Sequence, residues 1–221
     1  MSASPQVIAI DGPAASGKSS VARLLARRLG MGYVNTGMMY RAATWYLLEK
    51  GIDPSDAGKV VESIGAADIA CGFAGGDAWI RFEGRDPAPH LSSESVNAAV
   101  SLVAGLPGVR RVLVAHQQAL ASERPVVMEG RDIGTVVSPG SPWKFYIDAS
   151  PDVRARRRAA QGLADEIAAR DRVDSTRKDS PLAVASDARV IDTSDLTLDQ
   201  VVDAVELALR EAGFPSPAAP A

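Results

Sequence analysis

The chain has little cysteine, histidine and lysine, and it lacks long apolar runs. A single cysteine, Cys71, excludes an intramolecular disulfide and a multi-cysteine metal site, so we interpret it as a small buried hydrophobe. The two histidines, His90 and His116, are interpreted as surface or partner-contact residues rather than catalytic ones. No apolar run approaches the roughly 18 residues of a membrane span, and the first residues, MSASPQ, do not resemble a secretory leader. We therefore expect a cytosolic protein.

Positive charge is also in short supply, and most of it is arginine. The net charge of −3 argues against a nucleic acid or an anionic membrane as the partner. Nineteen of the 24 basic residues are arginines, and several lie between Arg154 and Arg177. The planar guanidinium suits phosphate and carboxylate groups, so this stretch is a candidate anion-binding segment. No exposed heptad or apolar stripe is evident, and a monomer is expected.

Short apolar runs alternate with helical patterns, which predicts an α/β fold. The runs cover residues 6–10, 126–128, 144–147 and 189–191, each bounded by Pro, Gly or Asp. From Lys18 onward, Val21, Leu24, Leu25 and Leu29 follow helical spacing. Strand and helix alternation of this kind indicates a parallel sheet with helices on both faces.

Residues 51–96 depart from this alternation. Residues 69–73 and 78–82 flank AGGD and predict a small antiparallel hairpin, carried on an insertion in the parallel core. Residues 153–171 are rich in Arg, Ala and acids, a composition typical of a helical cover over a site. The end of the chain, FPSPAAPA, is expected to be a short disordered tail.

The segment from Gly12 to Ser19 reads GPAASGKS and fits the phosphate-binding pattern G-x4-G-K-[ST] at every specified position. Its glycines allow successive N–H groups to point inward, and the following helix adds a partial positive charge. Lys18 is expected to bridge the outer phosphates of a nucleoside triphosphate, and the Ser19 hydroxyl to ligate Mg²⁺. The expected ATP-binding residues are Gly12, Pro13, Ala14, Ala15, Ser16, Gly17, Lys18, Ser19 and Ser20.

Four further segments carry groups that bind anions or read bases. They are NTGMMYR at 35–41, NAAVSLVAGLPGVR at 97–110, EGRDIGTVV at 129–137 and RDRVDSTRKDSPL at 170–182. Together with the phosphate-binding segment from Gly12 to Ser19, these four segments occur in an order that resembles that of the bacterial cytidylate kinases. The resemblance covers nearly the whole chain, from about residue 7 to 210. Many enzymes share the phosphate-binding segment. The resemblance is made far more specific by three motifs together, N-A-A-x-S-x-V-A-x-x-P-x-V-R, G-R-D-I-G-T-V-V and R-D-x-x-D-S-x-R-x-x-S-P-L.

The resemblance implies transfer of the γ-phosphoryl group of MgATP to CMP or dCMP, giving ADP and CDP or dCDP, in pyrimidine nucleotide metabolism. It implies a P-loop core (1–38 and 104–213) with a five-stranded parallel sheet, an inserted CMP-binding domain (39–103), a short lid (152–172) and a tail (214–221). The implied CMP-binding residues are Thr36, Tyr40, Arg41, Ser101, Arg110, Arg131, Asp132, Arg170, Asp174 and Arg177. The implied catalytic residues are Lys18, Arg131, Arg154, Arg157 and Arg158.

These roles make chemical sense. Asp132 can accept a hydrogen bond from the cytosine amine N4, while Ser101 or Arg110 donates to N3 or O2. Uracil has an acceptor in place of N4, and a site left with an unpaired polar group rejects such an analogue strongly. The attacking oxygen of a monophosphate is already ionised at neutral pH, so no general base is needed.

Structural alternatives exist for each residue. Arg41 can simply end a helix, residues 154–158 can form a solvated helix face, Asp132 can pair internally with Arg131, and Asp174 can cap a helix. At the level of the whole chain, a kinase for another monophosphate or a small alcohol, and an ATP-gated binding module, are the competing hypotheses.

The chain also departs from the family's pattern in three places. Asn35 stands where relatives usually have an acid, and Ser92 where they often have an arginine. The segment that forms the lid is short as well. Glu129, next to Gly130, is a candidate to share the role of the missing acid toward Mg²⁺.

Overall fold

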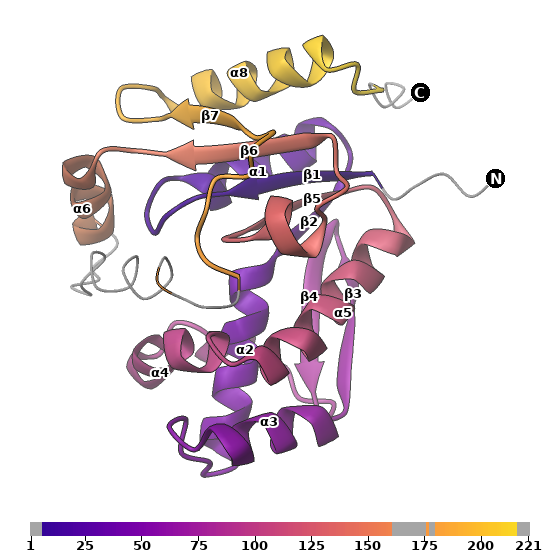
Figure 1. The fold of residues 1–221 in the computed structure, drawn as a ribbon, viewed down its shortest axis with the longest axis vertical. Helices are drawn as coiled ribbons and strands as arrows, with labels where there is room; N and C mark the ends of the chain where they lie inside the picture. The colour runs from indigo at the N-terminus through magenta and orange to yellow at the C-terminus, as the bar shows by residue number, and fades with distance from the viewer. Residues whose placement is uncertain (1–5, 161–175, 177–179, 216–221) are drawn as a thin grey trace.

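The computed structural model describes residues 6–160, 176 and 180–215 of the chain. Its helices and strands alternate as the sequence predicts (Figure 1). In chain order they are β1 (Val7–Asp11), α1 (Lys18–Arg28), β2 (Gly32–Asn35), α2 (Thr36–Glu49), α3 (Ala57–Ala66), β3 (Ile69–Ala74), β4 (Asp77–Phe82), the short 3-10 helix η1 (Ala88–His90), α4 (Glu94–Ala104), α5 (Pro107–Glu123), β5 (Val126–Gly130), the π-helical turn η2 (Ile133–Val137), β6 (Trp143–Asp148), α6 (Pro151–Ala160), β7 (Arg189–Asp192) and α8 (Leu198–Glu211).

The strands form one sheet in the order β3-β4-β2-β5-β1-β6-β7. The five strands from β2 to β7 run parallel and correspond to the five-stranded parallel sheet that was expected. The sheet nevertheless has seven strands, because the hairpin joins its edge. Strand β4 is parallel to β2 and pairs with it at a single position, Tyr33 with Asp77.

The predicted hairpin forms as β3 and β4, and its turn is two residues long because each strand extends one residue further than expected. Ala74 pairs with Asp77, and the two residues between them, Gly75 and Gly76, have φ angles of 57° and 92°. Positive φ at both central positions is the requirement of a type I′ turn, which suits the twist of a hairpin. Two glycines meet that requirement without strain.

Each face of the sheet is buried under its own group of helices. On β1, Ile8 and Ile10 pack with residues of α1 and α8 on one face of the sheet. Val7 and Ala9 point to the opposite face, where they pack with residues of α2, α3, α4 and α5. Strands buried on both faces read as continuous apolar runs, which explains why the sequence signals these strands so clearly.

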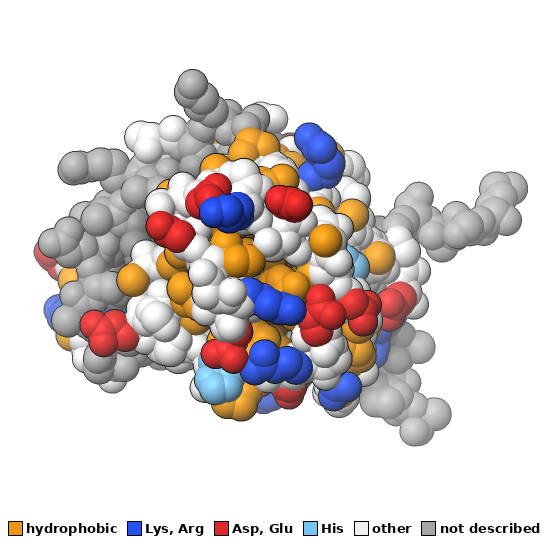
Figure 2. Space-filling view, turned by 90° about the horizontal axis from the view of Figure 1, so that it is seen from below, with side chains coloured by type: hydrophobic (Ala, Val, Ile, Leu, Met, Phe, Trp, Pro, Cys, Tyr) orange, Lys and Arg blue, Asp and Glu red, His pale blue; other side chains and the backbone are white. Residues whose placement is uncertain are grey.

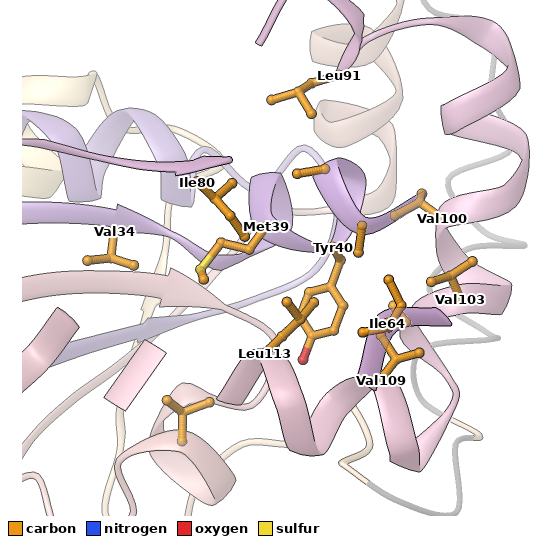
Figure 3. Packing of buried hydrophobic residues seen from close by; sticks show 14 of the residues in the cluster. Val34, Met39, Tyr40, Ile64, Ile80, Leu91, Val100, Val103, Val109 and Leu113 are labelled. Carbon is orange, nitrogen blue, oxygen red and sulfur yellow. The ribbon is translucent and has the colours of Figure 1, made fainter. Parts of the chain in front are cut away.

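The apolar core on the face of Val7 and Ala9 extends from the sheet into residues 39–103 as one continuous cluster. Figure 3 shows the Tyr40 ring of α2 close to Leu113 of α5, and Met39 of α2 beside Ile80 of β4. This packing holds the start of α2 at the carboxyl end of β2.

At the C-terminal end, Phe214 is the first residue of the expected tail. It is buried, and its ring packs edge-on against Trp143 with 4.8 Å between centroids. Residues 216–221 lie outside the described part of the chain.

None of the described helices is by itself long and apolar enough to cross a membrane. The pair α4 and α5 reaches the required length and composition only when taken together, and it is bent by 97°.

Candidate active site

The phosphate cradle lies between β1 and α1, at the carboxyl edge of the parallel strands. Gly17 caps α1 with a φ of 93°, and Gly12 has a φ of 155°. A Cβ atom on Gly12 would lie 2.1 Å from the carbonyl oxygen of Ile147, so only glycine fits there. Ala15 also adopts a left-handed conformation, with φ at 58°. Backbone geometry of this kind is typical of loops that direct N–H groups at an anion.

Two polar side chains of the cradle fit a phosphate. The Lys18 ammonium donates to the Pro13 carbonyl oxygen at 3.1 Å and lines the cleft beside the loop. Ser16 is fully buried, and its hydroxyl has no hydrogen-bond partner among the described residues. Because buried hydroxyls are nearly always paired, this orphaned group suits a bound phosphate oxygen.

A single cleft of about 710 Å³ joins the cradle to the acceptor segments. It brings together most of the residues that the sequence analysis singled out. The expected site residues that line it are Ala14, Ala15, Ser16, Gly17, Lys18, Ser19, Ser20, Thr36, Tyr40, Arg41, Ser101, Arg110, Arg131, Asp132, Arg157 and Arg158.

The acceptor end of the cleft contains a buried ion pair. Arg110, on α5, donates through Nη2 to Oδ2 of Asp132, and both side chains are only 6% exposed. Arg110 also donates to the Ala104 carbonyl oxygen at 3.3 Å and lies over the Tyr40 ring, 5.3 Å from its centroid. The partner of Asp132 is therefore Arg110, and the alternative of an internal pair with Arg131 is wrong.

Arg131 instead reaches back to the cradle. Its Nη1 donates to the Gly12 carbonyl oxygen at 2.5 Å. Nearby, the Thr36 hydroxyl donates to the Glu129 carbonyl oxygen at 2.8 Å. These two bonds connect the end of strand β5 to the cradle on one side and to the start of α2 on the other.

Arg41 lies within α2 and does not end that helix, which runs on to Glu49. Its Nη1 donates to the Leu91 carbonyl oxygen and to Oδ1 of Asn97, both at 2.8 Å. These acceptors fix the side chain at the cleft wall. Ser101, one of the proposed base readers, lines the same cleft from α4.

Three of the four arginines of α6 contact the cradle or line the cleft, whereas Arg156 is exposed. Arg154 donates through Nη1 to the Ala14 carbonyl oxygen at 3.3 Å. Arg157 donates to the Ser16 carbonyl oxygen at 3.1 Å and to both the hydroxyl and the carbonyl oxygen of Thr193. Arg158 lines the cleft. Three guanidinium groups from one helix thus gather at the phosphate end.

Three of the implied residues cannot be placed. Arg170, Asp174 and Arg177 lie outside the described part of the chain. The alternative reading of Asp174 as a helix cap is equally untested.

Asp11 is a site residue that the sequence analysis missed. It is the last residue of β1, is 5% exposed, and accepts backbone hydrogen bonds from Ile133 and Gly134, both at 2.8 Å. Burial raises the pKa of its carboxyl to about 6, against the lowering effect of those two bonds. A carboxylate at the end of an apolar strand is a weak signal, since its partners lie more than 120 residues away.

Glu129 is also buried at the cleft, at the end of β5. The Tyr33 hydroxyl donates to its Oε1 at 3.2 Å, and Asn35 donates through Nδ2 to the Tyr33 oxygen at 3.3 Å. Burial, with the charge of Glu129 next, raises the pKa of Tyr33. Asn35 also caps α2, because its Oδ1 accepts from the Met38 N–H. The amide that replaces the family's usual acid therefore has a structural use of its own.

Further cleft residues come from the segment after β7. Leu196, Leu198 and Val201 add an apolar wall beside the cradle, next to Thr193. No motif marks these residues in the sequence.

The histidines and the cysteine lie elsewhere. His90 stacks on Trp45 with 5.6 Å between ring centroids, and burial lowers the pKa of His116. Cys71 is half-buried, and burial raises the pKa of its thiol to about 11. None of the three lines the cleft.

Comparison with known proteins gives consistent results. The family model described as cytidylate kinase matches residues 8–211. Cytidylate kinase from Rhodococcus opacus (strain B4) is 43% identical over 223 residues, covering 96% of this chain and 97% of the relative. The Mycobacterium avium (strain 104) protein of the same name is 45% identical, with coverages of 93% and 95%. Cytidylate kinase from Pelotomaculum thermopropionicum is 44% identical, with coverages of 88% and 92%. The chain belongs to the cytidylate kinase family.

Proposed function

We propose that the protein transfers the γ-phosphoryl group of ATP to CMP or dCMP, giving ADP and CDP or dCDP, within pyrimidine nucleotide metabolism. The observation that carries this proposal is the single cleft in which the cradle and the buried Arg110–Asp132 pair face one space. Family membership and the names of the relatives support it. A kinase needs both a triphosphate site and an acceptor site within transfer distance, and this cleft offers both.

The cradle holds the triphosphate. Residues 12–20 surround the phosphates with backbone N–H groups, Lys18 neutralises charge on the outer phosphates, and the buried Ser16 hydroxyl supplies a further donor. The apolar wall of Leu196, Leu198 and Val201 suits the adenine ring.

The acceptor site reads cytosine through its polar edge. Asp132 accepts from N4, while Arg110 and Ser101 donate to N3 and O2. The ion pair between Arg110 and Asp132 fixes the orientation of the carboxylate before substrate arrives. Arg41 and Arg131 bind the CMP phosphate in this proposal, together with Tyr40 and Thr36; all four line the cleft, which supports these roles. Arg170, Asp174 and Arg177 complete the site in this proposal.

Transfer needs alignment and charge neutralisation rather than a base. A phosphate oxygen of CMP forms a bond to the γ-phosphorus as the bond to the bridging oxygen of ADP breaks, and no side chain takes up a proton. Lys18, Arg131, Arg154, Arg157 and Arg158 stabilise the charge that spreads over the transferred group. In this proposal the segment 152–172, which the structure describes only as far as Ala160, acts as the lid that excludes water from this step.

Mg²⁺ fits the oxygen donors of this cleft. The Ser19 hydroxyl and the Glu129 carboxylate both line it, and hard oxygen ligands are what this ion prefers. The described residues contain no cluster of three or more metal-binding side chains. The ion, when bound, neutralises charge on the β- and γ-phosphates.

We propose a division into domains that matches this function. Residues 1–38 and 104–213 form the P-loop core, residues 39–103 the CMP-binding insertion, and residues 214–221 the tail. The protein acts on small molecules as a cytoplasmic monomer, without nucleic acid or membrane partners. On the face shown in Figure 2, positive and negative side chains are interspersed with hydrophobic ones, as on an ordinary surface.

The test is ADP release from MgATP with CMP, dCMP, UMP, AMP, GMP or no acceptor. Release that depends on CMP and dCMP supports the proposal. Release with another monophosphate leaves a kinase but refutes the cytosine assignment, and release without an acceptor favours an ATP-gated module. Lys18→Ala should abolish turnover, whereas Lys59→Ala, on the exposed face of α3, should not.

A further inference from the structure

The carboxylate of Asp11 links the two halves of the cleft. Asp11 directly precedes Gly12, the first residue of the cradle. Its Oδ1 accepts from the Ile133 N–H and its Oδ2 from the Gly134 N–H, both at 2.8 Å. These two N–H groups belong to the first residues after Asp132, the proposed reader of cytosine. The turn that carries the proposed base-reading carboxylate is therefore hydrogen-bonded to the last residue of β1.

The turn is fixed on its other side as well. The Asp132 carbonyl oxygen accepts from the N–H groups of Val136 and Val137, at 2.8 and 3.2 Å. Asp132 itself has a φ of −147° and a ψ of 27°, outside both helix and strand values. With the backbone in this conformation, its side chain meets Arg110. Asp11 supplies the hydrogen bonds that hold the residues immediately following.

Burying the Asp11 carboxylate to accept from two N–H groups costs desolvation free energy. Asp11 is 5% exposed, and burial raises the pKa of its carboxyl to about 6. Its interaction with Lys18 is only a minor influence, and Asp132 repels it. A carboxylate offers two acceptors and no donor, whereas an amide of the same shape offers one acceptor and one donor. The geometry at Ile133 and Gly134 requires two acceptors.

We propose that Asp11 is a positioning residue for cytosine recognition, which holds the 132–134 turn so that Asp132 faces the acceptor base. This inference rests on the proposed function. Its consequence is that the strand leading into the ATP cradle also determines which base the acceptor site admits. A substitution at Asp11 should therefore alter the choice between CMP and UMP, even though Asp11 does not line the cleft.

Asp11→Asn tests the proposal, because it keeps the shape and removes one acceptor. Loss of a hydrogen bond to a charged acceptor weakens an interaction about tenfold or more. We expect the KM for CMP to rise about tenfold and the ratio of kcat/KM for CMP over UMP to fall by a similar factor. The KM for ATP should change by less than about threefold, since the loop keeps its own backbone bonds.

Ser141→Ala is the matched control. Its buried hydroxyl donates to the Val7 carbonyl oxygen at 2.6 Å, at the opposite end of the same strand. This variant loses a buried hydrogen bond of β1 and should keep the CMP to UMP ratio of the unmodified protein. An Asp11→Asn variant in which the KM values for CMP and ATP rise together, or in which the CMP to UMP ratio is unchanged, overturns the proposal. Failure of the unmodified protein to phosphorylate CMP at all would instead refute the proposed function.

If Asp11→Asn does not fold, the pH dependence of the unmodified protein replaces it. Protonation of Asp11 below about pH 6 removes one acceptor in the same way. CMP and UMP carry the same phosphate, so its titration cancels in their ratio. The ratio should fall between pH 8 and 5.5, and a constant ratio overturns the proposal. The charged and titratable groups around this carboxylate are Lys18 on α1, Arg131 and Asp132 after β5, and Lys144 and Tyr146 on β6.

Discussion

The buried pair of Arg110 and Asp132 allows stability and recognition to be separated. Both side chains are 6% exposed, so removal of one partner leaves the other charge buried. Breaking such a pair typically destabilises a protein by about 3–5 kcal/mol, whereas replacing both members with apolar residues of similar size is often neutral or stabilising. We therefore expect Asp132→Ala to be far less stable than the double variant Arg110→Met, Asp132→Leu.

The assay is urea unfolding followed by fluorescence, combined with ADP release. A loss of about 3–5 kcal/mol lowers the urea midpoint by about 1–2 M for a protein of this size. The double variant should recover most of that loss. It should nevertheless phosphorylate CMP no better than UMP, because both proposed base readers are gone.

An exposed pair provides the comparison. Arg189 and Glu211 are 53% and 55% exposed, so Glu211→Ala should change stability by no more than about 1 kcal/mol and leave activity intact. The reasoning is refuted if the double variant is as unstable as Asp132→Ala, or if it still prefers CMP over UMP. The first result would mean that packing around Arg110, rather than its charge, sets the loss.

Three further predictions concern single residues. Arg157→Ala should lower kcat about 100-fold and change the KM for CMP little, as expected of a group that acts on the transferred phosphoryl. Tyr33→Phe should lower the unfolding free energy by about 1–3 kcal/mol, measured in urea, because the buried Glu129 carboxylate loses its hydroxyl donor. Burial raises the pKa of Asp11 from 3.8 to about 6, so the stability that its neutral form provides is complete below pH 3.8 and lost as the pH rises through 6. The stability of the unmodified protein relative to Asp11→Asn should therefore fall by about 3 kcal/mol between pH 4 and 7, at about 1.4 kcal/mol per pKa unit.

Each of these predictions has a contrary result. Equal losses in kcat and CMP affinity would argue against a transition-state role for Arg157. An unchanged urea midpoint for Tyr33→Phe would mean that Glu129 finds another donor. A pH-independent difference between the unmodified protein and Asp11→Asn would show that the Asp11 carboxyl titrates alike in the folded and unfolded chain.

The elements of the fold were largely predictable because their signals are local. Residues 6–10 and 126–128 are apolar runs bounded by turn formers, and both became central parallel strands. The hairpin turn at Gly75 and Gly76 was equally clear. Attachment of that hairpin to the sheet was not predictable, since it depends on one pairing between Tyr33 and Asp77, separated by 44 positions.

The residues of the site likewise divide into those with local sequence signals, which were predictable, and those brought together by long-range contacts, which were not. The cradle and the motif at 129–137 are contiguous in sequence, and the resemblance located them directly. A pair with the neighbouring Arg131 was only the structural alternative for Asp132, and the fold instead brings Arg110 to this carboxylate across 22 positions. Asp11 was not predicted because its carboxylate accepts from two backbone N–H groups. Nearly every residue has a backbone N–H group, so a sequence does not indicate which ones act as donors to a side chain.

The central place of β1 in the sheet has a consequence during synthesis. Val7 pairs with Val126 on one side, and Ile8 pairs with Trp143 on the other. The strand that carries the ATP cradle therefore has no sheet partner until more than half of the chain has been made. At about 5–20 residues per second, this apolar segment waits roughly ten seconds on the ribosome, open to chaperones and to neighbouring chains. Strand β1 is thus made before both of its sheet neighbours and waits for them.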